Sequence, residues 1–172
     1  MSIEIPLVHK YQTNQINCGP ASLQMILEYF KKSEEQDRLA KRMKTNDDPG
    51  GGTEAEEMIR EGRRQGFYCY ANAKGTSAEI RYFLSRGLPV VVWYRVDLSE
   101  QEDHYSVVYG FRGKTFFVAD PLDGKREMEE SELEKHWYED AIRNKGWMLV
   151  LSPEEFKLGK QYKPLFRRKN KK

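Results

Sequence analysis

The sequence predicts an α+β domain in which helices come first and pack on a mainly antiparallel sheet. Residues 18–87 repeat the 3.6-residue apolar spacing of amphipathic helices, with one short strand-like run between them. Residues 88–152 consist mostly of short β-branched and aromatic runs separated by turn residues. Helices followed by strands are typical of an α+β domain rather than of an alternating parallel fold. A chain of 172 residues is long enough for one such domain with a substantial core.

The strongest helical pattern begins at Cys18. Four apolar residues then recur at i, i+3, i+4 and i+7, which are Leu23, Ile26, Leu27 and Phe30. Proline two residues after the cysteine suits the first turn of a helix, where its missing N–H has no partner to lose. We therefore expect a helix over residues 18–32 with the cysteine at its first turn.

Shorter patterns predict the other elements. Thr53 and Glu56 match a capping box that opens a helix. Arg112 and Gly113 are expected to form the turn of a hairpin. We expect further helices at about 34–44, 53–64, 77–86 and 131–141, and strands at about 3–7, 67–73, 88–96, 104–111, 114–121 and 147–153.

Composition narrows the class of protein. Charged residues make up 33% of the chain, and the longest apolar run, residues 88–94, is too short to span a bilayer. No basic stretch followed by an apolar run marks a signal peptide at the N-terminus. Cys18 and Cys69 could form one disulfide at most, and intact thiols are the simpler interpretation. We expect a cytoplasmic protein without a transmembrane segment.

The positive charge is concentrated at the C-terminus. The last ten residues carry +6 of a net charge of +2, so residues 1–162 carry −4. Such an end can touch nucleic acid or anionic lipid, but most basic ends are solvated, and we expect no nucleic-acid partner. We assign residues 1–155 to the domain and residues 156–172 to a basic C-terminal extension.

Cys18 is the first candidate for chemistry. A thiol at a helix N-terminus lies near the positive end of the helix dipole and near N–H groups that lack partners. Both favour the thiolate, which is the nucleophilic form. The alternative is a small buried cysteine, because free cysteine is among the most buried residue types.

A thiolate nucleophile needs an imidazole base and an acid that orients it. Of the three histidines, His104 follows a polar loop and begins a strand, where its side chain can face a cleft. In the expected hairpin, a two-residue turn places Asp120 opposite Tyr105, and a three-residue loop places it opposite His104. Either register brings Asp120 within reach of the His104 ring. The alternative role for Asp120 is to start a turn, as Asp-Pro commonly does.

Donors for an oxyanion are also present. The Cys18 backbone N–H is one, and Gln12 or Gln15 could supply a side-chain amide. Asn14 and Asn17 lie in the same segment. All four amides also fit an ordinary polar loop.

With these residues in view, the chain resembles the papain-like bacteriocin-processing cysteine peptidases over most of residues 8–150. Three segments in order carry the resemblance: residues 12–27 with the cysteine, residues 88–110 with the histidine, and residues 118–124 with the Asp-Pro pair. Members of that family cleave leader peptides after a double glycine and usually form the N-terminal domain of an ABC exporter. The resemblance implies a papain-like fold in which Gln12, not Gln15, is the oxyanion donor, because Gln12 precedes the cysteine by six residues.

Carried over in the same way, Cys18 is the nucleophile, His104 the base and Asp120 its orienter. No transmembrane or nucleotide-binding segment follows in this sequence, so we expect a stand-alone member that needs no cofactor or metal. We therefore expect a cysteine peptidase acting on a peptide or protein, with a double-glycine leader as the substrate class that the resemblance implies. The sequence does not fix the cleavage site, the oligomeric state or a transporter partner.

Three alternatives use the same residues. An amine that intercepts the acyl-enzyme would make the protein an acyl or peptidyl transferase. A fold that kept its peptide site but lost its chemistry would be a binding module, against which the intact set Gln12, Cys18, His104 and Asp120 argues. A zinc site could use the cysteine, histidine and aspartate, but no closely spaced ligand pair supports it.

Overall fold

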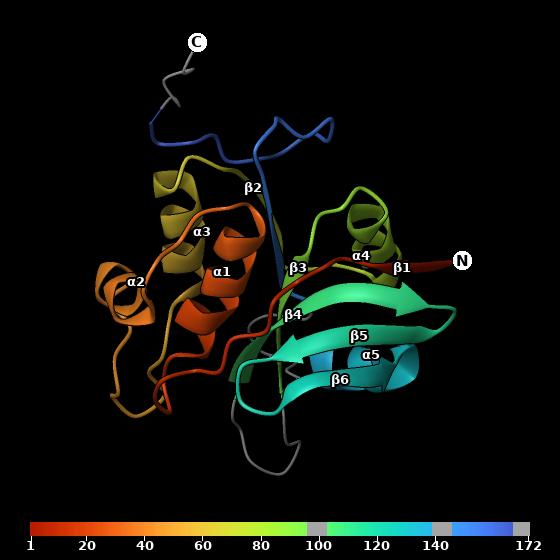
Figure 1. The fold of residues 1–172 in the computed structure, drawn as a ribbon, viewed down its shortest axis with the longest axis horizontal. Helices are drawn as coiled ribbons and strands as arrows, with labels where there is room; N and C mark the ends of the chain where they lie inside the picture. Colours follow the sequence, from red (N-terminus) through yellow and green to blue (C-terminus); the bar gives the residue numbers. More distant parts are fainter. Residues whose placement is uncertain (96–102, 139–145, 167–172) are drawn as a thin grey trace.

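The computed structural model describes residues 1–95, 103–138 and 146–166, to which every structural statement below refers (Figure 1). The helices are α1 (Cys18–Tyr29), α2 (Gln36–Arg42), α3 (Ala55–Arg64), α4 (Ser77–Leu84) and α5 (Glu130–Tyr138). The strands are β1 (Ser2–Glu4), β2 (Tyr68–Asn72), β3 (Val90–Arg95), β4 (Asp103–Arg112), β5 (Thr115–Asp120), β6 (Gly124–Glu129) and β7 (Met148–Ser152). Of the polar loop expected over residues 98–103, only Asp103 lies within the described residues. The helix expected over residues 131–141 is described as far as Tyr138.

All strands join one antiparallel sheet in the order β2-β7-β3-β4-β5-β6, and β1 pairs with the second half of β4. Helices α1, α2 and α3 form a group to one side of β4, β5 and β6 (Figure 1). This arrangement confirms the predicted α+β class with N-terminal helices on a mainly antiparallel sheet.

Helix α1 lies at the centre of the core because it is apolar on more than one side. Leu23, Ile26 and Leu27 of the predicted stripe are fully buried, and so is Met25. The helix packs against β4 as well as against α2 and α3. Burying a leucine-sized side chain stabilises a fold by about 1.5–3 kcal/mol, so this contact fixes the start of α1 relative to the sheet.

The hairpin of β4 and β5 has a different register from either one expected. Arg112 pairs with Thr115, so the turn is formed by Gly113 and Lys114 rather than by Arg112 and Gly113. The register then shifts by one residue at a bulge between Val108 and Gly110. A Cβ at Gly110 would come within 2.5 Å of the Ile3 carbonyl oxygen, so the glycine allows β1 to approach the bulge closely.

One other expectation was wrong, and one strand was not predicted. The expected capping box at Thr53 is absent: the N-cap of α3 is Glu54, and Thr53 Oγ1 instead lies 2.7 Å from Thr45 Oγ1. A capping box does open α4, between Thr76 and Glu79. Strand β6 was not predicted, because its residues are mostly charged and only Gly124 and Met128 are buried.

The segment after β7 stays close to the body. Tyr162 exchanges both backbone hydrogen bonds with Cys69 of β2, and the Leu165 N–H donates to the Arg63 carbonyl. Phe156 packs its ring against Tyr70. The boundary after residue 155 remains a prediction, but residues up to 165 contact the domain.

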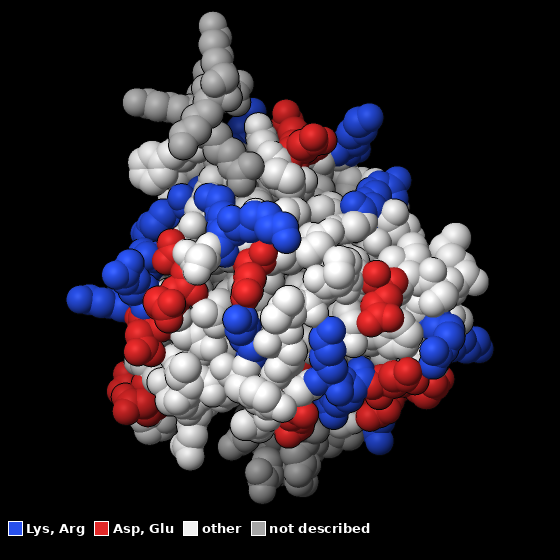
Figure 2. All heavy atoms as spheres, in the orientation of Figure 1, with Lys and Arg blue, Asp and Glu red and all other residues white. Residues whose placement is uncertain are grey.

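Positive and negative side chains are interspersed over the face shown in Figure 2, as expected for a chain with 29 basic and 27 acidic residues. Among the described helices, none combines the length and the apolar character needed to cross a bilayer.

Candidate active site

Cys18 is the first residue of α1, as predicted, and its side chain is partly exposed. The N–H groups of a first turn have no partners within the helix. Asn17 occupies the N-cap position but makes no capping hydrogen bond to these groups, and its Nδ2 donates instead to Thr13 Oγ1. The N–H groups around the thiol are therefore not taken up by a side-chain cap.

Close packing fixes the start of the helix. A Cβ at Gly19 would lie 2.9 Å from Cβ of Thr53. Tyr105 of β4 donates its hydroxyl hydrogen bond to the Thr53 carbonyl at 2.9 Å. Glycine after the cysteine thus lets residue 53 pack against the helix, and β4 holds that residue in place.

His104 and Asp120 are in direct contact. His104 Nε2 lies 2.9 Å from Asp120 Oδ1, and the side chains are almost fully buried. Continuing the observed register places Ser106 opposite Asp120, so His104 is its diagonal neighbour on the same face of the sheet. The other ring nitrogen, Nδ1, is not used by Asp120, and Cys18 lines the same cleft as His104.

The charges of the three groups depend on one another. Burial alone would lower the pKa of His104, but its interactions with Asp120 and Cys18 raise it to about 9. Burial would raise the pKa of Asp120, but the hydrogen bond and charge of His104 hold it well below its usual range. An imidazolium between a carboxylate and a thiol is therefore the favoured state at neutral pH.

Three side chains support the other oxygen of Asp120. Tyr94 donates to Asp120 Oδ2 at 2.7 Å, and Ser106 donates to the same oxygen at 2.9 Å. Arg126 of β6 donates to the Tyr94 hydroxyl at 2.8 Å. Burial and the Asp120 charge raise the pKa of Tyr94 well above its usual value, so its hydroxyl keeps its proton.

The N-terminal segment is fastened to the Asp120 turn. His9 Nε2 donates to the Asp120 carbonyl, and the Gln12 N–H donates to the Pro121 carbonyl at 2.9 Å. The Gln12 side chain donates from Nε2 to the Asn14 carbonyl at 2.8 Å, while its Oε1 is buried without a hydrogen-bond partner among the described atoms. The structure therefore places the Gln12 backbone beside the turn that follows Asp120, while the Gln12 amide N–H is directed at the Asn14 carbonyl.

Cys18, His104 and Gln12 line one cleft of about 660 Å³. Its walls come from the N-terminal segment and the start of α1, the glycine-rich loop before α3, strand β3, the start of β4 and the turn between β5 and β6: Gln12, Gln15, Ile16, Cys18, Asp48, Gly50, Gly51, Gly52, Thr53, Trp93, Asp103, His104, Tyr105 and Leu122. Both candidate glutamines thus border the cleft. Among the described residues, no group of three or more His, Cys, Asp and Glu side chains is arranged to hold a metal ion.

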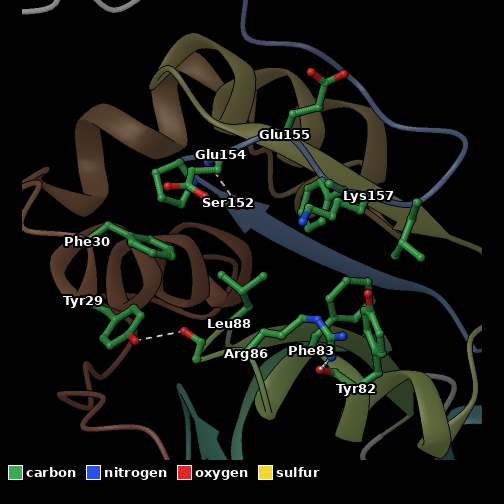
Figure 3. A pocket seen from close by; sticks show the side chains of 14 residues that line it. Tyr29, Phe30, Tyr82, Phe83, Arg86, Leu88, Ser152, Glu154, Glu155 and Lys157 are labelled. Atoms are coloured by element: carbon green, nitrogen blue, oxygen red, sulfur yellow. Dashed lines mark hydrogen bonds between the residues drawn. The ribbon is translucent and has the colours of Figure 1, made fainter.

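A second hollow of about 540 Å³ lies elsewhere, between α1, α4 and residues 152–158. Figure 3 shows Tyr29, Tyr82 and Arg86 around it, with Tyr29 hydrogen-bonded to the Gly87 carbonyl. Neither a cysteine nor a histidine lines this hollow. Nucleophile and imidazole meet only in the first cleft of the described structure.

Tyr94, Ser106 and Arg126 were missed from the sequence. Ser106 lies two residues from His104, so the alternation of the strand was a usable signal for a shared face. Tyr94 pairs directly with His104 across β3 and β4, which required the register. Arg126 could not be found because its strand was not predicted.

Comparison with known sequences places this site in context. Residues 7–145 match the model of the peptidase C39 family. The chain is similar to two processing and transport ATP-binding proteins. One is LagD for lactococcin G, from Lactococcus lactis subsp. lactis, and the other is MesD for mesentericin Y105, from Leuconostoc mesenteroides. LagD is 28% identical over 127 residues, covering 74% of this chain and 17% of LagD; MesD is 27% identical over 142 residues, covering 78% and 19%. The chain thus spans less than a fifth of the length of these relatives.

Solved structures share the fold. A double glycine motif protease from an AMS/PCAT transporter, solved with its leader peptide, matches with a TM-score of 0.69 at 20% identity, covering 88% of this chain and 94% of that one. A C39-like peptidase from Bacillus anthracis matches with a TM-score of 0.74 at 14% identity, covering 91% and 100%. These likenesses show the papain-like fold predicted from the resemblance, and the family match covers most of the sequence. The chain belongs to the peptidase C39 family.

Proposed function

We propose that this protein is a cysteine peptidase whose catalytic residues are Cys18, His104, Asp120 and Gln12. The observation that carries the proposal is that a helix-terminal thiol and a buried imidazole line one cleft, and that the imidazole is hydrogen-bonded to the buried Asp120 carboxylate. A raised pKa at His104 supports an imidazolium that pairs with the Cys18 thiolate.

In the proposed reaction, the Cys18 thiolate attacks a peptide carbonyl, and His104 gives its proton to the leaving amine. Asp120 accepts one ring N–H and keeps the imidazole oriented. The Cys18 backbone N–H and the Gln12 amide stabilise the oxyanion, which requires the Gln12 side chain to turn from Asn14 when substrate binds. Water then releases the acyl-enzyme and restores the thiol.

We further propose that the substrate is a peptide with a double-glycine leader. Two observations support this finer assignment: the curated relatives are named for processing bacteriocins, and a solved structure of the same fold holds a leader peptide. The sequence similarity covers the part of the chain that carries the cleft.

Thiol labelling tests the proposal without a known substrate. Iodoacetamide should alkylate Cys18 rapidly and Cys69 only after unfolding, because Cys69 is fully buried and burial raises its pKa to about 12. His104→Ala should slow labelling of Cys18, since the thiolate loses its cationic partner. Equal labelling of the two cysteines in the folded protein would contradict the proposal.

Turnover is the second test. Synthetic peptides with a Gly-Gly pair at the scissile position should be cleaved. Matched peptides with Ala-Ala at that position should not be cleaved. Cys18→Ala should abolish cleavage while leaving the melting temperature close to that of the wild type. Cleavage that persists in Cys18→Ala would exclude a thiol mechanism, and products longer than the hydrolysis fragments would indicate transfer to an amine.

A further inference from the structure

Asp120 is held on the side away from His104 by three side chains to which the proposed reaction gives no role. Tyr94 and Ser106 donate to Oδ2, while His104 contacts Oδ1. Tyr94 and Ser106 are buried, and Arg126 reaches the Tyr94 hydroxyl from β6. Hydrogen bonds to a buried charge are among the stronger ones in proteins, so these contacts bear directly on the state of the carboxylate.

The chemistry of the donors fixes the direction of this network. A guanidinium only donates hydrogen bonds, so the Tyr94 hydroxyl is the acceptor from Arg126. A tyrosine hydroxyl has a single proton, which must therefore go to Asp120. Ser106 lies 3.3 Å from the Tyr94 hydroxyl and 2.9 Å from Asp120, so its proton also points to the carboxylate at the shorter distance.

The groups facing Asp120 come from every strand around it. His104 lies on β4, Tyr94 on β3 and Arg126 on β6, with a guanidinium nitrogen 4.0 Å from Oδ2. The N–H groups of Leu122 and Asp123 in the following turn donate to Oδ1 at 2.8 and 3.2 Å, and Asp123 adds a negative charge near Arg126. His9 contacts only the backbone carbonyl. The carboxylate is thus surrounded by donors and by two cations.

We propose that Tyr94, Ser106 and Arg126 are positioning residues of the catalytic site, which keep the Asp120 carboxylate ionised and turned so that its other oxygen meets His104. The inference rests on the proposed function, because it assigns these residues a task only if Asp120 orients the imidazole. The three side chains act through Asp120, and none of them belongs to the lining of the cleft.

Loss of these donors has a defined consequence. Without these hydrogen bonds the Asp120 carboxylate is no longer held with Oδ1 toward His104, so it stabilises the imidazolium less. The imidazolium then loses its partner, and the thiolate of Cys18 loses the imidazolium. As the solution is made more acidic, the rate of Cys18 alkylation should therefore begin to fall at a higher pH in the variants than in the wild type.

The experiment is the pH profile of Cys18 alkylation by iodoacetamide in Tyr94→Phe, Ser106→Ala and the double variant. A hydrogen bond to a charged group alters the ionisation of that group by roughly tenfold or more. The acid midpoint of Cys18 alkylation should therefore move up in the double variant by at most about one pH unit, because the effect reaches the thiol only through His104. Ser106→Thr keeps a hydroxyl and should retain the wild-type midpoint. Arg126→Lys should lie closer to the wild type than Arg126→Gln.

Matched controls separate this effect from a loss of stability. Tyr70 donates to Glu79 at 2.7 Å and Ser77 donates to Glu134 at 2.9 Å, and both carboxylates lie away from the cleft. These two contacts match those of Tyr94 and Ser106 with Asp120. Tyr70→Phe and Ser77→Ala should leave the acid midpoint unchanged, whatever their melting temperatures.

Each result has one meaning. If Cys18 alkylation depends on His104 but all profiles superimpose on that of the wild type, the three residues are only structural and the inference is overturned. If Ser106→Thr behaves like Ser106→Ala, the hydroxyl is not the active group and the inference is likewise overturned. If Cys18 is alkylated at the same rate in the wild type and in His104→Ala, it is the proposed function that fails.

Discussion

Replacing Asp120 by asparagine should lower the pH at which His104 loses its proton. Burial lowers the pKa of His104, but the hydrogen bond and charge of Asp120, together with Cys18, raise it from 6.5 to about 9. Asparagine can keep the hydrogen bond but not the charge. We expect the pKa of His104 to fall by about one to two and a half units in Asp120→Asn.

The consequence is largest near pH 8. A histidine with a pKa of about 9 is roughly nine-tenths protonated there, whereas a fall to between 8 and 6.5 leaves about half to a few per cent protonated. Because a protonated His104 is needed to protonate the leaving amine, the alkaline limb of turnover should move to lower pH by the same amount.

Nuclear magnetic resonance of the labelled imidazole carbons measures this directly, because the chain has only three histidines and His104→Gln identifies the signal. Asp123→Asn is the matched control: it removes an exposed carboxylate from the same turn. A His104 midpoint that is equal in the wild type and in Asp120→Asn would refute the role given to Asp120.

Three further predictions follow from single contacts. Gln12→Ala should spare alkylation of the thiol but lower peptide turnover by about 10²–10³, the usual effect of one lost oxyanion donor; equal turnover would exclude the amide from that role. Gly19→Ala should destabilise the fold by about 1–3 kcal/mol in urea unfolding, because the new methyl group would lie 2.9 Å from Thr53. Gly159→Ala, where nothing lies within 4 Å of the added atom, is its control. Deleting residues 163–172 should leave the alkylation rate of the thiol unchanged, and a slower rate would show that the tail supports the cleft.

Local patterns predicted most of the fold because they are repeated within a few residues. The apolar spacing after Cys18 and the position of Pro20 are enough to start a helix at the thiol, and the structure has that start. The run over residues 88–96 predicted a buried central strand, and β3 is bordered by β4 and β7. Neither inference needs knowledge of distant partners.

The hairpin register could not be predicted, because it depends on contacts that lie far apart in sequence. Gly113 has a positive φ of 57° and can occupy either central position of a two-residue turn. The bulge before Gly110 forms where β1 approaches, which the hairpin sequence does not reveal. His104 and Asp120 still meet, since a diagonal neighbour in a sheet is within reach of a histidine side chain.

The candidate site was predicted only as far as chemistry limits the choice. A thiol at a helix start, one suitably placed imidazole and one acid on the expected hairpin leave few combinations. The supporting groups around Asp120 are ordinary tyrosine, serine and arginine side chains, and many such residues occur in the chain. Only the pairing of β3, β4, β5 and β6 singles out the three that contact the acid.

Strand β7 has a consequence for the order in which the protein matures. It is the last of the described strands along the chain, yet it lies between β2 and β3 and pairs with both. While the ribosome is still adding residues before Met148, β2 and β3 have no common neighbour, and the sheet beside His104 is incomplete. The thiol at Cys18 is synthesised more than a hundred residues earlier. The nascent chain therefore carries Cys18 through most of translation before the sheet that contains His104 can be completed.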